Sequence, residues 1–154
     1  MKFLAIIPAR KGSRGLVNKN FKSLCKKPLI DYTIKAAQKS LFIDRLIIST
    51  NDKKIINYSK KNNIEFVKRP EKLSRSTSKV IDAVQHVLKH LKKKNYIPDF
   101  IVTLQPTSPL RKAIHIDEAI QLFLSNPNAD SLVSCQQVPH IFNPNSLYSF
   151  NNFF

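Results

Sequence analysis

Short apolar runs alternate along this chain with longer stretches in which apolar residues recur every three or four positions. The runs predict β-strands at residues 3–8, 45–50, 64–67, 100–104 and 131–134. The periodic stretches predict amphipathic helices at residues 28–37, 51–62, 78–94 and 113–125. Strands that alternate with helices favour an α/β fold, with a mostly parallel sheet and helices on both of its faces.

Polar loops follow the first four predicted strands, at residues 8–20, 49–52, 68–78 and 105–111. In a parallel sheet all strands end at the same edge, and ligands bind in the crevice beyond that edge. We therefore expect the four loops to form one rim that carries the functional site.

The loop after the first strand holds both glycines of the chain, Gly12 and Gly15. Glycine is used where the backbone needs a positive φ or where a ligand approaches closely. The loop has no acidic residue, and its basic residues are Arg10, Lys11, Arg14 and Lys19. Backbone N–H groups and fixed cations suit a polyphosphate, although the composition also fits a plain basic surface turn. The P-loop and GxGxxG patterns are absent, so neither a P-loop NTPase nor an ordinary dinucleotide-binding protein is supported.

Composition narrows the class of protein further. A length of 154 residues indicates one domain, and no apolar run approaches the roughly 18 residues of a membrane span. Cys25 and Cys135 lack a CxxC context, which argues against a zinc site or a disulfide scaffold and favours a cytoplasmic protein. The net charge of +16 suggests nucleic acid as a partner. Most lysines fall in the predicted helices or at their ends, however, so we favour a solvated, lysine-rich surface.

Six segments resemble those of the acylneuraminate (sialic acid-type) cytidylyltransferase family and occur in the same order, over nearly the whole chain. The segments are Ile-Pro-Ala-Arg-Lys-Gly-Ser-Arg-Gly (7–15), Lys-Asn (19–20), Lys-Pro-Leu-Ile (27–30), Ile-Ser-Thr-Asn-Asp (48–52), Lys-Arg-Pro (68–70) and Leu-Gln-Pro-Thr-Ser-Pro-Leu-Arg (104–111). The resemblance implies a three-layer, Rossmann-like fold of the nucleotide-diphospho-sugar-transferase type, with residues 1–154 in a single nucleotidyltransferase domain.

The family transfers CMP from CTP to a nine-carbon keto sugar acid such as N-acetylneuraminate, with release of pyrophosphate and with Mg²⁺ as cofactor. By this resemblance Arg10 and Lys19 are the catalytic residues, because they would hold the triphosphate and stabilise charge as pyrophosphate leaves. The implied nucleotide-binding residues are Ala9, Arg10, Gly12, Ser13, Arg14, Gly15, Lys19, Asn20 and Arg69. The implied sugar-binding residues are Gln105, Thr107 and Ser108. From the residues alone, 105–108 fit a proline-rich turn equally well, and Thr50 and Asp52 fit a strand end and a helix cap better than catalysis.

The chain also departs from the family pattern. Asn51 stands in place of a usual acid, and Ser76 stands where aspartate is common. The family continues into a segment with dimer contacts, further sugar contacts and a pair of aspartates that hold Mg²⁺. Residues 136–154 resemble the start of that segment, and no Asp-x-Asp pattern occurs in this chain. We therefore expect no metal ligand within the chain, and a homodimer if the C-terminal part were present. The alternative function is a truncated, non-catalytic remnant that binds CTP.

Overall fold

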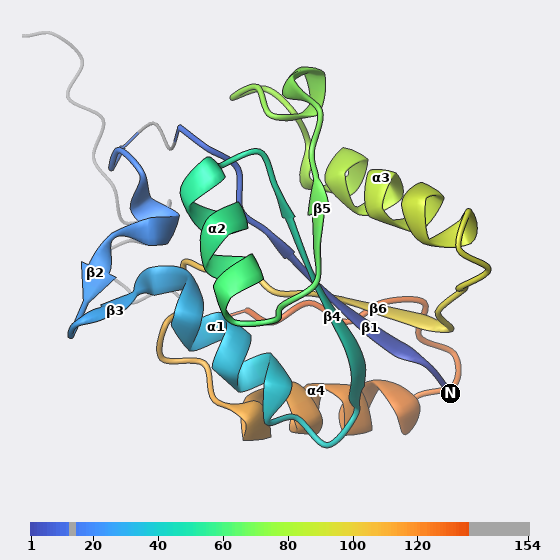
Figure 1. Ribbon diagram of the computed structural model, residues 1–154. Helices are drawn as coiled ribbons and strands as arrows, with labels where there is room; N and C mark the ends of the chain where they lie inside the picture. Colours follow the sequence, from blue (N-terminus) through green and yellow to red (C-terminus); the bar gives the residue numbers. More distant parts are fainter. Residues whose placement is uncertain (13–14, 136–154) are drawn as a thin grey trace, which may run out of the picture.

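The computed structural model describes residues 1–12 and 15–135, and its centre is a four-stranded parallel sheet (Figure 1). The strands, in their spatial order, are β5 (Phe66–Lys68), β4 (Ile43–Thr50), β1 (Phe3–Pro8) and β6 (Phe100–Thr103). Ile6 of β1 stands opposite Ile47 of β4 and Thr103 of β6, so β1 is the central strand of the three. A separate antiparallel hairpin consists of β2 (Ser23–Leu24) and β3 (Lys27–Pro28).

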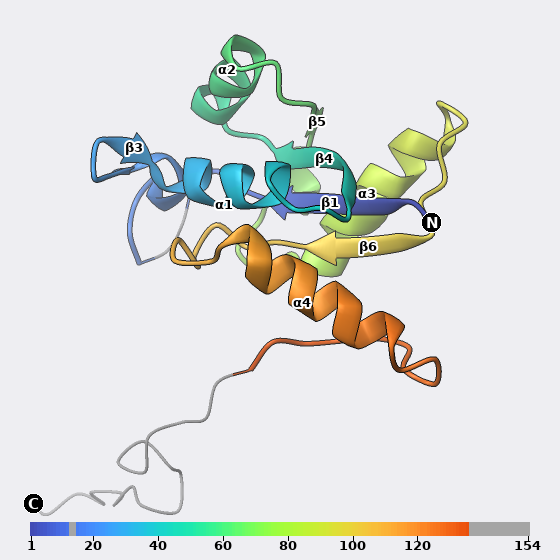
Figure 2. The same ribbon diagram turned by 90° about the horizontal axis from the view of Figure 1, so that it is seen from below.

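Within the part of the chain that the structure describes, four helices cover the sheet on both faces (Figure 2). The helices are α1 (Leu29–Gln38), α2 (Lys53–Lys61), α3 (Val80–Lys92) and α4 (Ala113–Leu124), and two 3-10 turns are η1 (Lys19–Phe21) and η2 (Glu71–Leu73). Side chains of α1, α2 and α4 pack on one face, and those of α3 pack on the other. No helix among these described residues is long and apolar enough to cross a membrane. The predicted three-layer α/β fold is confirmed.

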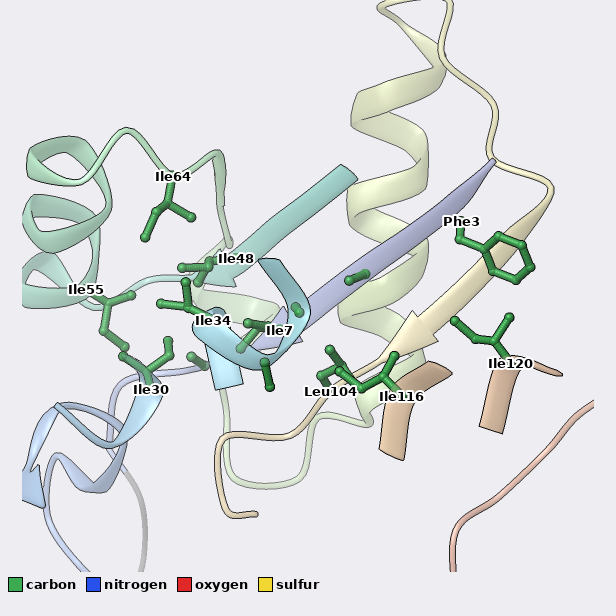
Figure 3. Close-up of a cluster of buried hydrophobic side chains, with 14 residues drawn as sticks. Phe3, Ile7, Ile30, Ile34, Ile48, Ile55, Ile64, Leu104, Ile116 and Ile120 are labelled. Carbon is green, nitrogen blue, oxygen red and sulfur yellow. The ribbon is translucent and has the colours of Figure 1, made fainter. Parts of the chain in front are cut away.

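Strand β1 is buried on both sides because its side chains alternate between the two faces of the sheet. Ala5 and Ile7 point into the cluster beneath α1, α2 and α4 (Figure 3). Leu4 and Ile6 point to the opposite face, toward α3. All four side chains are fully excluded from solvent. Burial of each leucine or isoleucine stabilises the fold by about 1.5–3 kcal/mol, so β1 anchors both halves of the core.

The third strand begins later than the apolar run at 64–67 predicts. Ile64 instead follows the turn that ends α2, where its N–H donates to the Ser59 carbonyl at 2.9 Å and Asn63 takes a left-handed φ of 52°. The Ile64 side chain still packs into the core. An apolar residue can do this from a position just after a helix as well as from a strand, so the run alone does not mark where β5 begins.

The prediction of a fifth strand at 131–134 is wrong. Residues 131–135 are irregular and exposed, and Val133 keeps 82% of its accessible surface. The segment lines a cavity beside β6 without joining the sheet. Residues with a high strand propensity form a strand only where a neighbouring edge pairs with them, and no strand among the described residues pairs with this segment. The tail at 136–154, which resembles the start of a dimerisation and sugar-binding segment, lies outside the described residues.

A buried carboxylate ties the helices of one face together. Asp31 of α1 is only 6% exposed, accepts a hydrogen bond of 2.5 Å from the Tyr58 hydroxyl of α2 and forms an ion pair of 2.9 Å with Lys35. Burial raises the pKa of Asp31, but Tyr58 and Lys35 outweigh it, so this pKa lies below its ordinary value. Burial and the bond to Asp31 raise the pKa of Tyr58 to about 12. The Tyr58 ring also packs edge-on against Phe21 of η1, with centroids 5.7 Å apart, so the network supports the loop that follows β1.

We predict that Tyr58→Phe lowers the free energy of unfolding by about 1–3 kcal/mol, because the buried Asp31 carboxylate loses its hydroxyl donor. Tyr32→Phe is the matched control. The Tyr32 hydroxyl donates to the Leu24 carbonyl at 2.7 Å in an exposed position, where water can replace it. Urea unfolding at neutral pH measures both variants, and equal losses of stability would contradict the role given to the buried network.

Asp31 should also make stability depend on pH in acid. Its folded-state pKa lies below the ordinary value of 3.8, so the unfolded chain takes up the proton first as the pH falls. The stabilisation is therefore present above about pH 4 and is lost as the pH falls through the folded-state pKa. Asp31→Asn does not titrate, so the gap in urea midpoint between this variant and the wild type should shrink on acidification. A gap that stays constant from neutral to acid pH would argue against this assignment.

Candidate functional site

The loops that follow the strands share one rim at the carboxyl end of the sheet, as predicted. The Ala9 N–H donates to the Ser49 carbonyl at 2.9 Å, and the Arg69 N–H donates to the Thr50 carbonyl at 2.8 Å. The Leu104 N–H donates to the Ile6 carbonyl of β1 at 2.9 Å, which brings the loop after β6 to the same edge. Ala9, a predicted nucleotide-binding residue, is completely buried, and its N–H is committed to the bond with Ser49.

The loop after β1 turns at Gly12, which has the left-handed φ of 74° that the sequence analysis expects of a loop glycine. The turn brings the Gly12 carbonyl to Arg10, whose Nη1 donates to it at 2.6 Å. Gly15 has no left-handed φ, and open space surrounds the position of a Cβ atom there, so sterics do not require glycine. Ser13 and Arg14, two of the predicted nucleotide-binding residues, lie outside the described residues.

The second half of this loop ends in η1, which leads into the hairpin of β2 and β3. Asn18 enters the turn with a left-handed φ of 55°. Asn20 is buried, and its Nδ2 donates to the Arg10 carbonyl at 3.3 Å. Lys19 lies next to it and is half-buried. The structure thus brings three predicted site residues, Arg10, Lys19 and Asn20, into one hydrogen-bonded loop.

Arg69 places a buried guanidinium at the rim, with only 5% of the residue exposed. Its Nε and Nη2 donate to the Ser49 hydroxyl at 3.1 Å and to the Ser49 carbonyl at 2.9 Å. No ion pair joins it to a carboxylate within residues 1–12 and 15–135. Burial, together with the nearby charge of Arg10, lowers the pKa of Arg69 to about 10, so the group stays positive at neutral pH. A buried cation without an anionic partner is costly, and an anionic ligand would remove part of that cost.

Asn51 and Glu71 connect the loops of the rim, although the sequence analysis gives neither of them a role. Asn51 Oδ1 accepts a hydrogen bond from the Lys11 N–H at 2.8 Å. Its Nδ2 donates to the two carboxylate oxygens of Glu71 at 3.3 and 3.2 Å. Lys11, Asn51 and Glu71 lie in three separate loops. Their proximity could have been anticipated from the sequence only because all three loops were predicted to share one rim.

His86 of α3 is a further residue that the sequence analysis did not identify. Burial lowers the pKa of His86, and His90, Arg69 and Lys89 lower it further, so the imidazole is neutral near pH 7. Its Nδ1 is buried and has no hydrogen-bond partner among the residues described here. Val67, two residues before Arg69, packs in one cluster with Val84 and Val87 of α3, which brings this helix near the strand that leads to Arg69.

Thr50 and Asp52 have structural roles, as predicted. The Asp52 N–H donates to Thr50 Oγ1 at 3.0 Å, and Asp52 Oδ1 accepts from the Lys54 N–H at 2.9 Å. The second bond caps α2, because it satisfies a backbone donor that the first helical turn leaves unpaired. Both side chains are buried and committed to this cap, which leaves them unsuited to catalysis.

The predicted sugar-binding turn lies at a cavity beside β6 with a volume of about 990 Å³. Gln105, Ser108 and Arg111 line the cavity together with apolar side chains of β6 and α4. Thr107 is exposed in the same turn but is not part of the lining. Arg111 Nη1 donates to the Gln105 carbonyl at 3.3 Å, and burial lowers the pKa of Arg111. No role was predicted for Arg111, yet its partly buried charge suits an acidic ligand.

Mg²⁺ is the cofactor that the family resemblance implies. Residues 1–12 and 15–135 contain no group of three or more His, Cys, Asp or Glu side chains that could hold a metal ion. Mg²⁺ prefers octahedral oxygen ligands, including carboxylates, and the Glu71 carboxylate at the rim is already hydrogen-bonded to Asn51. We therefore assign no metal ligand among the described residues.

This chain is similar in sequence to known cytidylyltransferases. A family model described as Cytidylyltransferase matches residues 4–152. The N-acylneuraminate cytidylyltransferase of Escherichia coli O18:K1:H7 is 34% identical over 158 residues, which cover 99% of this chain and 36% of that relative. The CMP-N,N'-diacetyllegionaminic acid synthase of Legionella pneumophila is 37% identical over 123 residues, which cover 79% of this chain and 53% of that relative. In these two alignments the chain spans only about a third to a half of the relative.

Solved structures resemble this fold. A CMP:2-keto-3-deoxy-manno-octonic acid synthetase complexed with CTP superposes with a TM-score of 0.69 at 19% identity, over 83% of this chain and 49% of that one. A cytidylyltransferase from Leptospira borgpetersenii superposes with a TM-score of 0.63 at 25% identity, over 83% of this chain and 51% of that one. These likenesses support the predicted Rossmann-like, nucleotidyltransferase-type fold.

Inorganic tripolyphosphate should raise the melting temperature, because an anion at the rim compensates the buried charge of Arg69. Binding at about 100 times Kd adds about 2.7 kcal/mol to the stability. Arg69→Met should remove most of this shift but cost the free protein little, since the Ser49 carbonyl keeps its bond from the Ala9 N–H. Arg45→Met is the control, because it removes a guanidinium near the amino end of β4 that pairs with Glu65 at 2.7 and 2.8 Å. Scanning fluorimetry should show the same tripolyphosphate-induced rise in melting temperature in Arg45→Met as in the wild type. A rise of wild-type size in Arg69→Met would refute the anion site.

Proposed function

Because this chain belongs to the cytidylyltransferase family, we propose that it forms the nucleotide-binding part of an enzyme that activates a nine-carbon keto sugar acid with CTP. In this reaction the anomeric hydroxyl oxygen attacks the α-phosphorus of CTP. The bond from that phosphorus to the oxygen that bridges it to the β-phosphate breaks, and pyrophosphate leaves with that oxygen. The attacking hydroxyl releases its proton to solvent, and the products are the CMP-sugar and pyrophosphate.

The observation that carries this proposal is the buried guanidinium of Arg69 beside the cationic loop of Arg10 and Lys19. Negative charge builds up on the departing pyrophosphate, so the site needs fixed positive charge more than it needs a covalent nucleophile. We assign Arg10 and Lys19 to the triphosphate, where they stabilise the leaving group. Arg69 and Asn20 position the nucleotide, and the left-handed turn at Gly12 lets the loop approach the phosphates.

For the sugar acid we propose the cavity beside β6. Gln105 and Ser108, which line the cavity, would supply hydrogen bonds to hydroxyl groups, and the Arg111 guanidinium would meet the carboxylate. Thr107, in the same turn but outside the lining, would contact the exposed end of the sugar. Arginine suits this task because its planar group can bond a carboxylate through two N–H donors. Relatives of this chain are named for N-acylneuraminate, for N,N'-diacetyllegionaminic acid and for pseudaminic acid, which supports an acidic nine-carbon sugar as the substrate class.

Three further parts of the proposal rest on the family alone. They are Mg²⁺ as cofactor, a homodimer of the complete protein and a location in the cytoplasm. A second function, binding of CTP without turnover, is favoured by the lack of a metal-holding cluster among residues 1–12 and 15–135. The two functions differ in one observable, because both require CTP binding but only the first releases pyrophosphate.

CTP should raise the melting temperature more than ATP, GTP or UTP does, because the family uses a cytidine nucleotide and a ligand of the folded state stabilises it by mass action. Arg10→Ala and Lys19→Ala should each weaken CTP binding about tenfold, through loss of one charged contact. Lys94→Ala is the control, since Lys94 is exposed beyond α3 and away from the rim. Wild-type affinity in both rim variants would overturn their assigned roles.

A pyrophosphate-release assay with CTP, N-acetylneuraminate and Mg²⁺ then separates the two functions. Release that depends on the sugar acid supports the transferase. A CTP-selective thermal shift without release under any tested sugar acid supports binding without turnover. A protein that melts cooperatively but responds to no nucleotide would exclude both.

A further inference from the structure

Asn51 joins two parts of the rim that are distant in the chain. It follows β4, the strand that pairs with β1 on one side and with β5 on the other. Its partners are the backbone N–H of Lys11, in the loop after β1, and the carboxylate of Glu71, in η2 after β5. One side chain therefore links the loops that follow three neighbouring strands.

We propose that Asn51 is a positioning residue, whose amide sets the spacing between the two cationic loops that receive the nucleotide. Arg10 directly precedes Lys11, and Arg69 lies two residues before Glu71. The bridge through Asn51 consequently constrains the chain next to both arginines. The inference rests on the proposed function in that the triphosphate of CTP is the ligand that these arginines would hold.

The bridge requires an amide. The Lys11 N–H is a donor and the Glu71 carboxylate is an acceptor, and an amide presents one acceptor and one donor group on a single short side chain. A carboxylate at position 51 would still accept from Lys11 but would repel Glu71. A methyl group would satisfy neither partner.

The bridge also engages the negative charge of Glu71, which lies two residues after Arg69 in the chain. Both carboxylate oxygens of Glu71 share the Asn51 amide, at 3.3 and 3.2 Å. Released from this bond, the carboxylate would be free to pair with Arg69 or Arg10 and to compete with phosphate for them. Asn51 thus keeps the arginines available for an anionic ligand.

The test is a double-variant cycle read by CTP affinity in isothermal titration. Asn51→Ala and Asn51→Asp should each weaken CTP binding about tenfold, and Glu71→Gln alone should change it less than about twofold. The double variant Asn51→Asp with Glu71→Gln should recover to within about threefold of the wild type, because the glutamine amide can donate to the new carboxylate.

If charge at positions 51 and 71 affected CTP affinity only at long range, without a bridge between the two side chains, the results would differ. In that case Glu71→Gln would tighten binding as much as Asn51→Asp weakens it, the cycle would be additive, and Asn51→Ala would resemble the wild type. Any of these results would overturn the proposal. Asn128→Asp, an equal change of charge at an exposed turn after α4, is the matched control and should leave affinity unchanged.

A second measurement needs no ligand. Hydrogen exchange of the Lys11 amide should be about tenfold faster in Asn51→Ala than in the wild type, because the amide loses its acceptor. Unchanged exchange would overturn the bridge itself. If the wild-type protein did not bind CTP, the proposed function would fall, while the exchange rate would still decide whether Asn51 holds the loop.

Discussion

The parallel alignment of β1 between β4 and β6 is the constraint on which the rest of this structure depends. It places the ends of the strands at one edge, so loops that are separated by dozens of residues meet there. The backbone hydrogen bonds from Ala9 to Ser49 and from Arg69 to Thr50 continue the ladders beyond the strands and into the loops. The rim is thus an extension of the sheet, and its geometry inherits the rigidity of a core that is buried on both faces.

Positive charge at the rim is concentrated at a cost to stability. Arg69 is buried against the Ser49 hydroxyl and carbonyl, which are dipoles and not charges, and its lowered pKa records the cost of that environment. Functional sites commonly retain such unfavourable arrangements because a ligand relieves them. In the scaffold below, by contrast, the buried carboxylate of Asp31 is paired with Lys35 and accepts a hydrogen bond from the Tyr58 hydroxyl.

The hydrophobic pattern predicted the four strands of the sheet and the four helices, because each depends on a local period that burial of one face requires. The pattern predicted the wrong backbone conformation where that conformation depended on pairing or packing with another segment of the chain. Ile64 packs into the core just after the turn that ends α2, and Leu132 with Val133 stays exposed because β6 does not pair with that segment. In both cases the apolar residues were recognised correctly, but their backbone conformation was decided by what lay beside them.

The same division holds at the site. The order of the elements, the rim, the cationic glycine loop and the family could all be predicted from the amino-acid sequence, because each depends on a local pattern or motif. The burial of Arg69, the place of Arg111 in the cavity lining and the bridge from Lys11 through Asn51 to Glu71 became visible in the three-dimensional structure alone. These properties arise from contacts between loops that follow different strands, and no local period or spacing encodes which atoms of those loops meet.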